Sequence, residues 1–218
     1  MNINRIRIVF EDSSVIVVDK PAGLLTMATD TERSKTVYAA LRAYLNEKRP
    51  AEKTFIVHRL DREASGLLVL AKTVEAKERL QTQFKDHSAG RRYVAVVEGY
   101  VKADDFTIRS YLAENSAYRV YSTPNRKAGK PAVTHVHVIK RNSKTSLVEV
   151  RLETGRKHQI RVHLAERGHP IVGDKNYGSR ANPIHRLALH GAHLDFKHPT
   201  TGKAIRFDSP YPKVFDSV

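Results

Sequence analysis

Short runs of apolar, mostly β-branched residues recur along the chain and predict a protein rich in strands. Thr134–Ile139 alternates between apolar and polar positions, with Val136 and Val138 on one side and two histidines on the other. This is the pattern of a strand with one buried face. The expected strands are Ile6–Phe10, Val15–Val18, Leu67–Leu70, Val94–Val97, Thr134–Ile139, Leu147–Leu152, Arg186–Leu189 and Ala204–Phe207.

Three further segments have the apolar spacing of amphipathic helices, and each follows a Ser or Thr that can cap a helix N-terminus. They are the segment after Ser34 with Val37, Tyr38, Leu41 and Leu45 on one stripe, the segment after Thr73 that contains Val74–Leu80 and Phe84, and the segment after Thr154 that ends near Gly168. Because these helices are not strictly interleaved with strands, we expect an α+β fold with a mixed, largely antiparallel sheet rather than a doubly wound parallel sheet.

Composition narrows the class of protein. The 218 residues are 40% apolar, which is enough for a sizeable core, and no linker or repeat divides them, so we expect one domain over residues 1–218. The net charge of +15 points to a polyanionic partner, either nucleic acid or an anionic membrane surface. With no cysteine, disulfides, iron–sulfur clusters and thiol nucleophiles are excluded.

Localisation follows from the absence of membrane and export signals in the sequence. No apolar run approaches the roughly 20 residues that a membrane-spanning helix needs. The first residues lack the apolar stretch of a signal peptide. We therefore expect a soluble, cytoplasmic protein.

The first candidate for chemistry is the charged segment His58–Gly66, which lies between two apolar runs and is expected to be a surface loop. Asp61 is flanked by Arg59 and Arg62, and nearby cations keep a carboxylate ionised even where it is partly buried. Such a carboxylate can act as a nucleophile or a base. Taken alone, the charge pattern favours an ordinary salt-bridged turn.

A second candidate is the segment Thr154–Arg161, at the expected start of the third helix. A helix N-terminus binds anions, and Arg156 and Lys157 beside it indicate that an anion such as a phosphate compensates their charge. Arg161 lies five residues further along and could instead reach a carboxylate on a neighbouring element. A solvated basic helix face explains the pattern equally well.

Tyr93 is the third candidate, because it follows two arginines at the start of an expected strand. An aromatic ring among cations can stack on a base while the cations hold phosphates. The alternative is an ordinary core or edge tyrosine. No phosphate-binding loop, dinucleotide-binding turn or zinc-protease motif is present, so we expect neither cofactor nor metal.

Five blocks of sequence, in order, resemble the RluA-type RNA pseudouridine synthases, over about Val15 to Pro212. The blocks are Val17–Leu24; His58–Asp61 with Ser65–Lys72; Arg92–Gly99; Thr154–Leu164 with Gly168–Asp174; and Arg186–His190 with His198–Gly202. The chain departs from many relatives at Glu63–Ala64. Only about 14 residues precede the first block, so we expect the separate RNA-binding module of many relatives to be absent.

The resemblance implies a pseudouridine synthase fold and an isomerase that flips a uridine out of ribosomal or transfer RNA without a cofactor. It implies Asp61 as the essential aspartate, Tyr93 as the active-site tyrosine and Arg161 as the partner of Asp61. The residues expected to bind RNA are Arg59, Arg62, Arg156, Lys157 and His158, of which Arg59 would take the place of the flipped base. Lys20, near a Pro-Ala-Gly turn, is expected to be structural.

We further expect a monomer with RNA as its partner and no association with membranes. A non-catalytic RNA-binding or assembly factor on the same scaffold is the alternative function. The carboxylate of Asp61 argues against that alternative, since a negative charge among phosphates weakens RNA binding.

Overall fold

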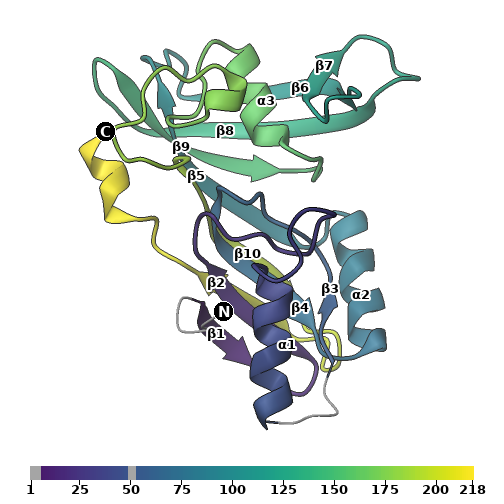
Figure 1. The fold of residues 1–218 in the computed structure, drawn as a ribbon. Helices are drawn as coiled ribbons and strands as arrows, with labels where there is room; N and C mark the ends of the chain where they lie inside the picture. Colours follow the sequence, from purple (N-terminus) through teal and green to yellow (C-terminus); the bar gives the residue numbers. More distant parts are fainter. Residues whose placement is uncertain (1–5, 49–52) are drawn as a thin grey trace. The chain divides into compact units, whose positions relative to one another are not determined.

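The structure, a computed structural model, describes residues 6–48 and 53–218 (Figure 1). The chain forms two compact units, which are described separately. Unit 1 contains the residues up to Arg91 together with Gly191–Pro210, and unit 2 contains Arg92–His190 and Tyr211–Val218. A compact unit need not fold on its own, so the expectation of a single domain remains a prediction.

Unit 1 is built on antiparallel strands. β2 (Val15–Lys20) pairs with both β1 (Arg7–Glu11) and β4 (Ser65–Ala71), and β4 also pairs with the short strand β3 (Phe55–Ile56). β10 (Leu189–Lys197), which enters unit 1 at Gly191, lies beside β4 and pairs with β11 (Ala204–Asp208).

Two helices belong to unit 1, α1 (Val37–Lys48) and α2 (Val74–Lys85). Thr73 caps α2 as expected, because its side chain accepts the backbone N–H of Ala76. For α1 the expected cap Ser34 is wrong: the Thr36 hydroxyl accepts the N–H of Ala39 at 3.0 Å, while the Ser34 hydroxyl bonds Glu32.

The core of unit 1 forms where the buried faces of its strands meet α2. Val17 lies opposite Val69 in the β2–β4 register, and both are buried against Leu80 of α2 and Phe196 of β10. Fully burying each such side chain contributes about 1.5–3 kcal/mol. The loops at the strand ends, which carry the candidate site, are therefore mounted on a rigid scaffold.

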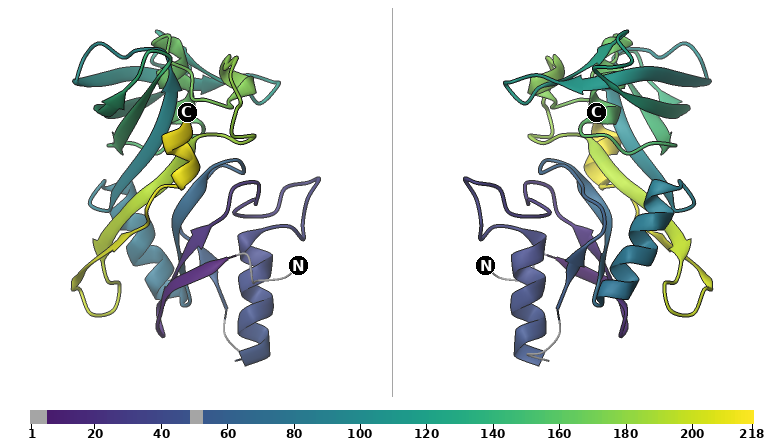
Figure 2. Two further views of the ribbon diagram at one scale, coloured as in Figure 1. Left: turned by 90° about the vertical axis from the view of Figure 1, so that its left-hand side faces the viewer. Right: turned by 90° about the vertical axis from the view of Figure 1, so that its right-hand side faces the viewer.

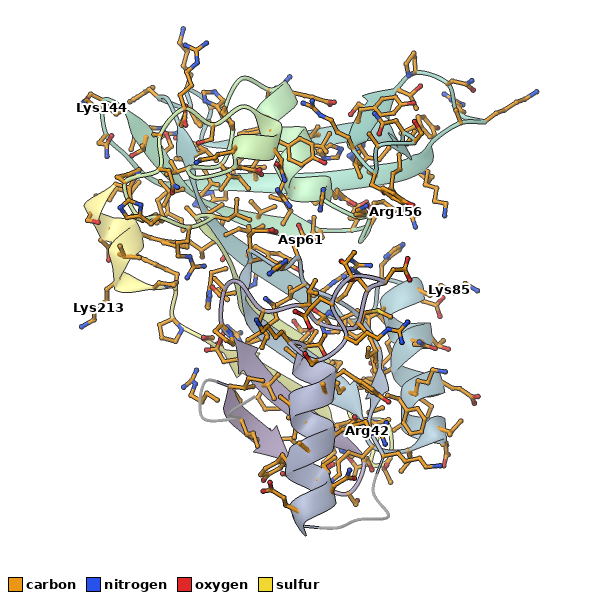
Figure 3. All side chains as sticks on the ribbon, in the orientation of Figure 1. Arg42, Asp61, Lys85, Lys144, Arg156 and Lys213 are labelled. Carbon is orange, nitrogen blue, oxygen red and sulfur yellow. The ribbon has the colours of Figure 1, made fainter. Side chains whose placement is uncertain are left out.

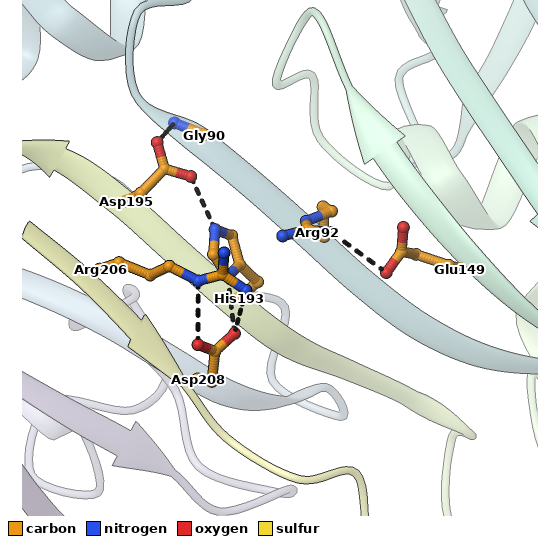
Figure 4. Close-up of polar contacts among 7 residues, drawn as sticks. All are labelled: Gly90, Arg92, Glu149, His193, Asp195, Arg206 and Asp208. Carbon is orange, nitrogen blue, oxygen red and sulfur yellow. Dashed lines mark hydrogen bonds and ion pairs between the residues drawn. The ribbon is translucent and has the colours of Figure 1, made fainter.

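A charged network also holds β10 to β11 (Figure 4). The two ring nitrogens of the buried His193 each contact a carboxylate at 2.7 Å, Nδ1 that of Asp208 and Nε2 that of Asp195. Arg206 pairs with Asp208 at 3.0 Å, and the Gly90 N–H donates to Asp195 at 3.3 Å. A Cβ at Gly90 would lie 2.2 Å from Asp195 Oδ1, so this close contact requires glycine.

Unit 2 is an antiparallel sheet with one covered face. Its strands run in the order β5, β9, β8, β6, β7. Their bounds are β5 (Gly90–Glu98, in unit 2 from Arg92), β6 (Asp105–Glu114), β7 (Val120–Thr123), β8 (Lys130–Arg141) and β9 (Thr145–Leu152). The helix α3 (Gln159–Glu166) lies on one face, seen from both sides in Figure 2, and two short 3-10 helices, η2 (Lys175–Tyr177) and η3 (Lys213–Ser217), complete the unit.

The contact between α3 and the sheet is apolar. Val162 of α3 and Tyr177 of η2 pack with Leu112, Val120 and Ala132 from three strands. The opposite face of these strands carries exposed polar side chains, the usual arrangement of an antiparallel sheet with one solvated side.

The expected α+β class and largely antiparallel sheet are confirmed, and seven of the eight expected strands are present within one to four residues at each end. The exception is Arg186–Leu189, of which only Leu189 is in a strand. Its other residues are held by separate hydrogen bonds: Ala188 donates its N–H to Val172 and accepts that of Val96. Strands β3, β6, β7 and, apart from Leu189, β10 were not among the expected strands.

The third helix begins four residues later than expected, so a cap at Thr154 is wrong. The Thr154 hydroxyl accepts the N–H of Val133 at 2.9 Å and donates to the Gln159 side chain at 2.8 Å. That side chain also accepts the Arg156 N–H at 3.0 Å, and His158 has the left-handed φ of 52°. These contacts favour a tight loop over a first helical turn, and α3 therefore starts at Gln159.

Within residues 6–48 and 53–218, no helix has the length and apolar character needed to cross a bilayer.

Candidate active site

The loop between β3 and β4 presents Asp61 between two residues whose backbones are fixed (Figure 3). The Thr26 hydroxyl donates to the Leu60 carbonyl at 3.0 Å and accepts the Leu60 N–H at 3.1 Å. On the other side, the Gly23 N–H donates to the Arg62 carbonyl at 2.8 Å. The segment around Gly23 thus holds the Asp61 backbone from both sides, which is the preorganisation a catalytic carboxylate needs.

The hydrogen bonds of Thr26 and Gly23 to the neighbours of Asp61 form a clamp around it, and Lys20 adds to this clamp from inside the protein. Its side chain is fully buried, and Nζ donates to the carbonyls of Leu24 at 2.7 Å, Pro21 at 3.1 Å and Arg62 at 3.2 Å. An ammonium group has three donors, so these carbonyls can satisfy all of them. These contacts favour the predicted structural role of Lys20 over a contact with RNA. The Lys20 ammonium group therefore lies at the carbonyl of Arg62, the residue that follows Asp61.

His58 fixes the start of the same loop. Its Nε2 accepts the Val69 N–H at 3.2 Å, and its ring stacks on Phe84 with 4.4 Å between the ring centres. Burial, and then the charge of Arg91, lowers the pKa of His58 to about 3. The ring is therefore neutral, and because Nε2 is an acceptor, the proton is assigned to Nδ1. His58 acts here as a fixed packing group rather than a titrating one.

Arg59 and Arg62 flank Asp61 with exposed side chains, as their predicted contact with RNA requires. Arg62 Nε also lies 3.4 Å from the Gly23 carbonyl. Asp61 itself is half-buried between them. The loop thus combines a rigid backbone with a basic outer surface.

Arg161 of α3 is buried in unit 2, where Asp174 binds it at two points. Its Nε lies 2.7 Å from Asp174 Oδ2 and its Nη2 lies 2.8 Å from Oδ1, with both side chains at most 3% exposed. The guanidinium carbon is also 5.1 Å from the centre of the Tyr177 ring. Asp174 and Tyr177 thus fix the position and the plane of the Arg161 guanidinium.

Asp174 was not identified from the sequence, although it ends one of the matched blocks. Its position depends on Gly173, whose φ is +82° and whose Cβ, if present, would lie 2.1 Å from the Arg186 carbonyl oxygen. No residue with a side chain fits there. Glycine in an apolar run immediately before an acidic residue is the only signal in the sequence that points to this turn.

Glu98, at the end of β5, supports the same turn. One of its carboxylate oxygens accepts the Ser179 hydroxyl at 2.6 Å and the N–H groups of Arg180 and Ala181 at 2.8 Å. The Ser179 hydroxyl in turn accepts the Gly173 N–H at 3.0 Å. Burial alone would raise the pKa of Glu98, but these hydrogen bonds outweigh it and lower the pKa. An ionised Glu98 thereby anchors the loop that supplies Asp174.

Tyr93 is the fourth residue of β5, because the strand begins at Gly90, four residues before the expected Val94. Its side chain is 7% exposed, and it lies opposite Val150 of β9. Tyr93 is thus on the largely buried face of the sheet, whereas Arg92 and Glu149 are on the other.

The three basic residues before α3 contact other parts of unit 2. Arg156 Nε donates to the Pro131 carbonyl at 3.1 Å, and Lys157 forms an ion pair with Glu114. His158 Nδ1 lies 2.8 Å from the Tyr177 hydroxyl. Because α3 begins at Gln159, Arg156 and Lys157 lie just before the helix rather than in its first turn. That an anion such as a phosphate compensates their charge, and that all three residues contact RNA, stay predictions.

The predicted site residues fall into two groups. Unit 1 carries Asp61 with Arg59 and Arg62, and unit 2 carries the remainder: Tyr93, Arg161, Arg156, Lys157 and His158. Each group is fixed by contacts within its own unit.

Comparisons with known proteins agree on one family. Residues 14–166 match the family described as RNA pseudouridylate synthase. A ribosomal large subunit pseudouridine synthase D of Neisseria meningitidis is 40% identical over 217 residues, which is 94% of this chain and 58% of the relative. An enzyme of the same name from Zymomonas mobilis is 40% identical over 95% of this chain and 70% of its own length. The chain thus spans little more than half of the first relative.

Solved structures agree on the fold. Human RNA pseudouridylate synthase domain containing 4 superposes with a TM-score of 0.81 at 22% identity, covering 96% of this chain and 90% of that one. Human RNA pseudouridylate synthase domain containing 1 gives 0.77 at 25% identity, covering 96% and 85%. The expected pseudouridine synthase fold is confirmed, and the chain belongs to the RNA pseudouridylate synthase family.

Proposed function

We propose that this protein converts uridine in RNA to pseudouridine, with Asp61 as its essential carboxylate. The observation that carries the proposal is the clamp around Asp61, in which Leu60 and Arg62 are bonded on the backbone to residues about 35–40 positions earlier. A solvent-exposed turn needs no such support, whereas a reacting carboxylate must be held in place. The family match adds the reaction type.

The reaction breaks the bond between ribose C1′ and N1 of uracil and forms one between C1′ and C5. N1 gains a proton and C5 loses one, so the atoms balance without an oxidant or water. Asp61 starts the reaction by attack on the sugar, attack on the ring, or removal of a sugar proton. Nucleophile and base are both roles of an ionised carboxylate.

Two residues of unit 2 assist in this proposal. Arg161 donates to the Asp61 carboxylate and fixes its direction. Asp174 orients Arg161 for this role through its two contacts at 2.7 and 2.8 Å. Tyr93 stacks on the uracil and is the candidate to take the C5 proton.

The target uridine must first leave its stack, at a cost of a few kcal/mol. The net charge of +15 supplies attraction to phosphates whatever the sequence, and Arg59 occupies the space that the base leaves. Arg62, Arg156, Lys157 and His158 are the proposed contacts to the flanking nucleotides.

We propose large-subunit ribosomal RNA as the first substrate to test, because several relatives are named for the ribosomal large subunit. Transfer RNA is the second. The protein is proposed to be monomeric and cytoplasmic, and to act without cofactor or metal.

Release of tritium from ribosomal RNA labelled at uracil C5 tests the proposal. The wild-type protein should release tritium, and Asp61→Asn should release none while binding RNA about as tightly. Asp86→Asn, which removes an exposed carboxylate at the end of α2, is the matched control and should retain full activity. An active Asp61→Asn protein would exclude Asp61, and a wild-type protein that binds RNA without releasing tritium would be a binding or assembly factor instead.

A further inference from the structure

The face of the unit 2 sheet that α3 leaves uncovered contains a basic pocket at one end. Along β6, Ser110 points toward α3, since its hydroxyl lies 2.9 Å from His163 Nε2. Side chains alternate along a strand, so Arg109 and Tyr111 point to the other face. A pocket of about 580 Å³ lies around these two residues, and none of the described residues that line it belongs to α3.

Strand pairing brings the walls of this pocket together. Tyr111 lies between Thr123 of β7 and Pro131 of β8, both of which are its partners in register. Val133 lies opposite Arg109. All of these residues line the pocket, so its floor belongs to three adjacent strands.

The segment between β7 and β8, residues 124–129, forms the remaining wall. Both strands pair with β6, and because β7 ends opposite Tyr111 and β8 begins opposite Leu112, this segment crosses the face of β6 near Tyr111. It does so in close contact, because a Cβ on Gly129 would lie 2.8 Å from both Tyr111 Cβ and Thr123 Cγ2. The segment places Arg126 with its guanidinium carbon 5.7 Å from the centre of the Tyr111 ring. The pocket is thus a concave site lined by an aromatic ring, by the arginine that lies over that ring and by a second arginine, Arg109.

The charge of the pocket is of one sign. Among the described residues that line it, two are arginines and none is acidic. Glu153, whose pKa is lowered by a hydrogen bond from His135 at 2.5 Å and also by the charge of Arg109, is not among the residues that line the pocket. A second pocket of about 410 Å³ on the same face differs, since acids and bases both line it, and its Glu149 pairs with Arg92 at 3.7 Å (Figure 4).

We propose that this pocket, formed by Arg109, Tyr111 and Arg126, binds an RNA segment other than the one that holds the target uridine. The guanidinium groups of Arg109 and Arg126 bind backbone phosphates, for which their planar donor geometry is suited. The stacked Arg126 and Tyr111 offer a flat surface for one base. The inference rests on the proposed function only in taking RNA as the partner, and it adds a second point of contact.

The test is direct binding of ribosomal RNA to the full chain carrying Asp61→Asn, so that no turnover occurs. Adding Arg109→Ala and Arg126→Ala should raise Kd about tenfold at 0.1 M salt. The salt dependence of log Kd should fall by about 1.4 to 1.8, the value for two lost phosphate contacts. Lys140→Ala/Lys144→Ala removes two exposed charges elsewhere in unit 2 and should change Kd less than twofold.

An equal rise in Kd in the two double variants would overturn the proposal, because net charge alone would then explain the loss of affinity. An unchanged Kd in the Arg109→Ala/Arg126→Ala variant would overturn it as well. Equal thermal midpoints show that the variants fold. Ultraviolet crosslinking of the wild-type chain to the same RNA gives an independent measurement, in which the tryptic peptide with Tyr111 should carry RNA. Its absence from the crosslinked peptides would contradict the proposal. Failure of the proposed function would appear separately, as a wild-type protein that releases no tritium.

Discussion

Arg161 and Asp174 form a two-point ion pair that is almost completely closed to solvent, with distances of 2.7 and 2.8 Å. A buried pair of this kind adds little net stability, because the loss of hydration offsets the attraction. Its clear effect is on geometry: two parallel hydrogen bonds fix the plane of the guanidinium. We infer that the main role of Asp174 is to orient the Arg161 guanidinium.

Removal of the Asp174 carboxylate should therefore strongly lower both the stability and the activity of the protein. In Asp174→Ala, the Arg161 charge stays buried without its carboxylate, and the free energy of unfolding should fall by about 3–5 kcal/mol. Urea denaturation measures this loss. Asp174→Asn keeps the shape and one acceptor, so it should lose less stability but still lower kcat in the tritium assay. A stable Asp174→Asn protein with wild-type kcat would show that the activity does not depend on the orientation of Arg161 by the Asp174 carboxylate.

Glu98 should also affect the orientation of Arg161, but indirectly, through the turn that supplies Asp174. Glu98→Ala removes the acceptor of three hydrogen bonds and loosens the Ser179–Gly173 contact that precedes Asp174. We expect a fall in kcat of about tenfold or more with little change in KM, because the Glu98 carboxylate is bonded within the turn that supplies Asp174.

Glu98→Gln is the matched control for this effect. Its amide oxygen can accept the same three donors, so it should restore most of the activity. Activity that is equally low in both variants would indicate that the charge, rather than the hydrogen bonds, matters. Unchanged activity in both would exclude Glu98 from the positioning of Arg161.

The sequence was sufficient for the candidate residues that lie in distinctive local patterns. Asp61 stands between arginines, and Arg161 follows a cluster of basic residues. Apolar patterns likewise predicted most strands: β2 and β4 are almost completely buried and stand out as continuous apolar runs, whereas β8 alternates because one of its faces is buried. β6 was missed because Ser110 interrupts its buried face, where it bonds His163 instead of packing as an apolar side chain.

The contacts that hold the site were not predictable, because they join residues far apart in sequence. Thr26 bonds Leu60 over 34 positions, and Glu98 bonds Ser179 over 81. The start of α3 was misplaced for a related reason: Thr154 is an acceptable cap, but its hydroxyl bonds Val133 and Gln159 instead. Local preference predicts elements, and tertiary hydrogen bonds decide where they begin.

Lys20 should affect activity without contacting RNA. Lys20→Met keeps most of the volume but leaves the carbonyls of Pro21, Leu24 and Arg62 without this donor. Each buried carbonyl that loses its partner costs about 1–3 kcal/mol. We expect a lower thermal midpoint and a lower kcat, with the affinity for RNA retained.

The control for Lys20 is Lys77→Met, which removes a charge from the half-exposed surface of α2 in the same unit. It should leave both the midpoint and kcat unchanged. If Lys20→Met instead weakens RNA binding and leaves kcat intact, Lys20 contacts RNA and the structural interpretation fails.

His163 should make the stability of the protein fall in mild acid. Its ring is fully buried between the Thr134 and Ser110 hydroxyls, and burial lowers its pKa from 6.5 to about 4. Between pH 6.5 and about 4, the His163 side chain binds a proton in the unfolded chain but stays neutral in the folded protein. The contribution to stability is therefore complete above pH 6.5 and is lost at about 1.4 kcal/mol per pH unit as the pH falls toward 4.

His163→Asn should remove this part of the pH dependence. The variant is expected to be less stable at pH 7.5, where it loses packing, and to differ less from the wild type at pH 5. The measurement is the free energy of unfolding in urea at half-unit steps between pH 7.5 and 4.5. His58, whose pKa is lowered to about 3, gives a similar slope in both proteins and cancels in their difference. A difference that is constant over this range would mean that His163 binds its proton equally in the folded and unfolded chains.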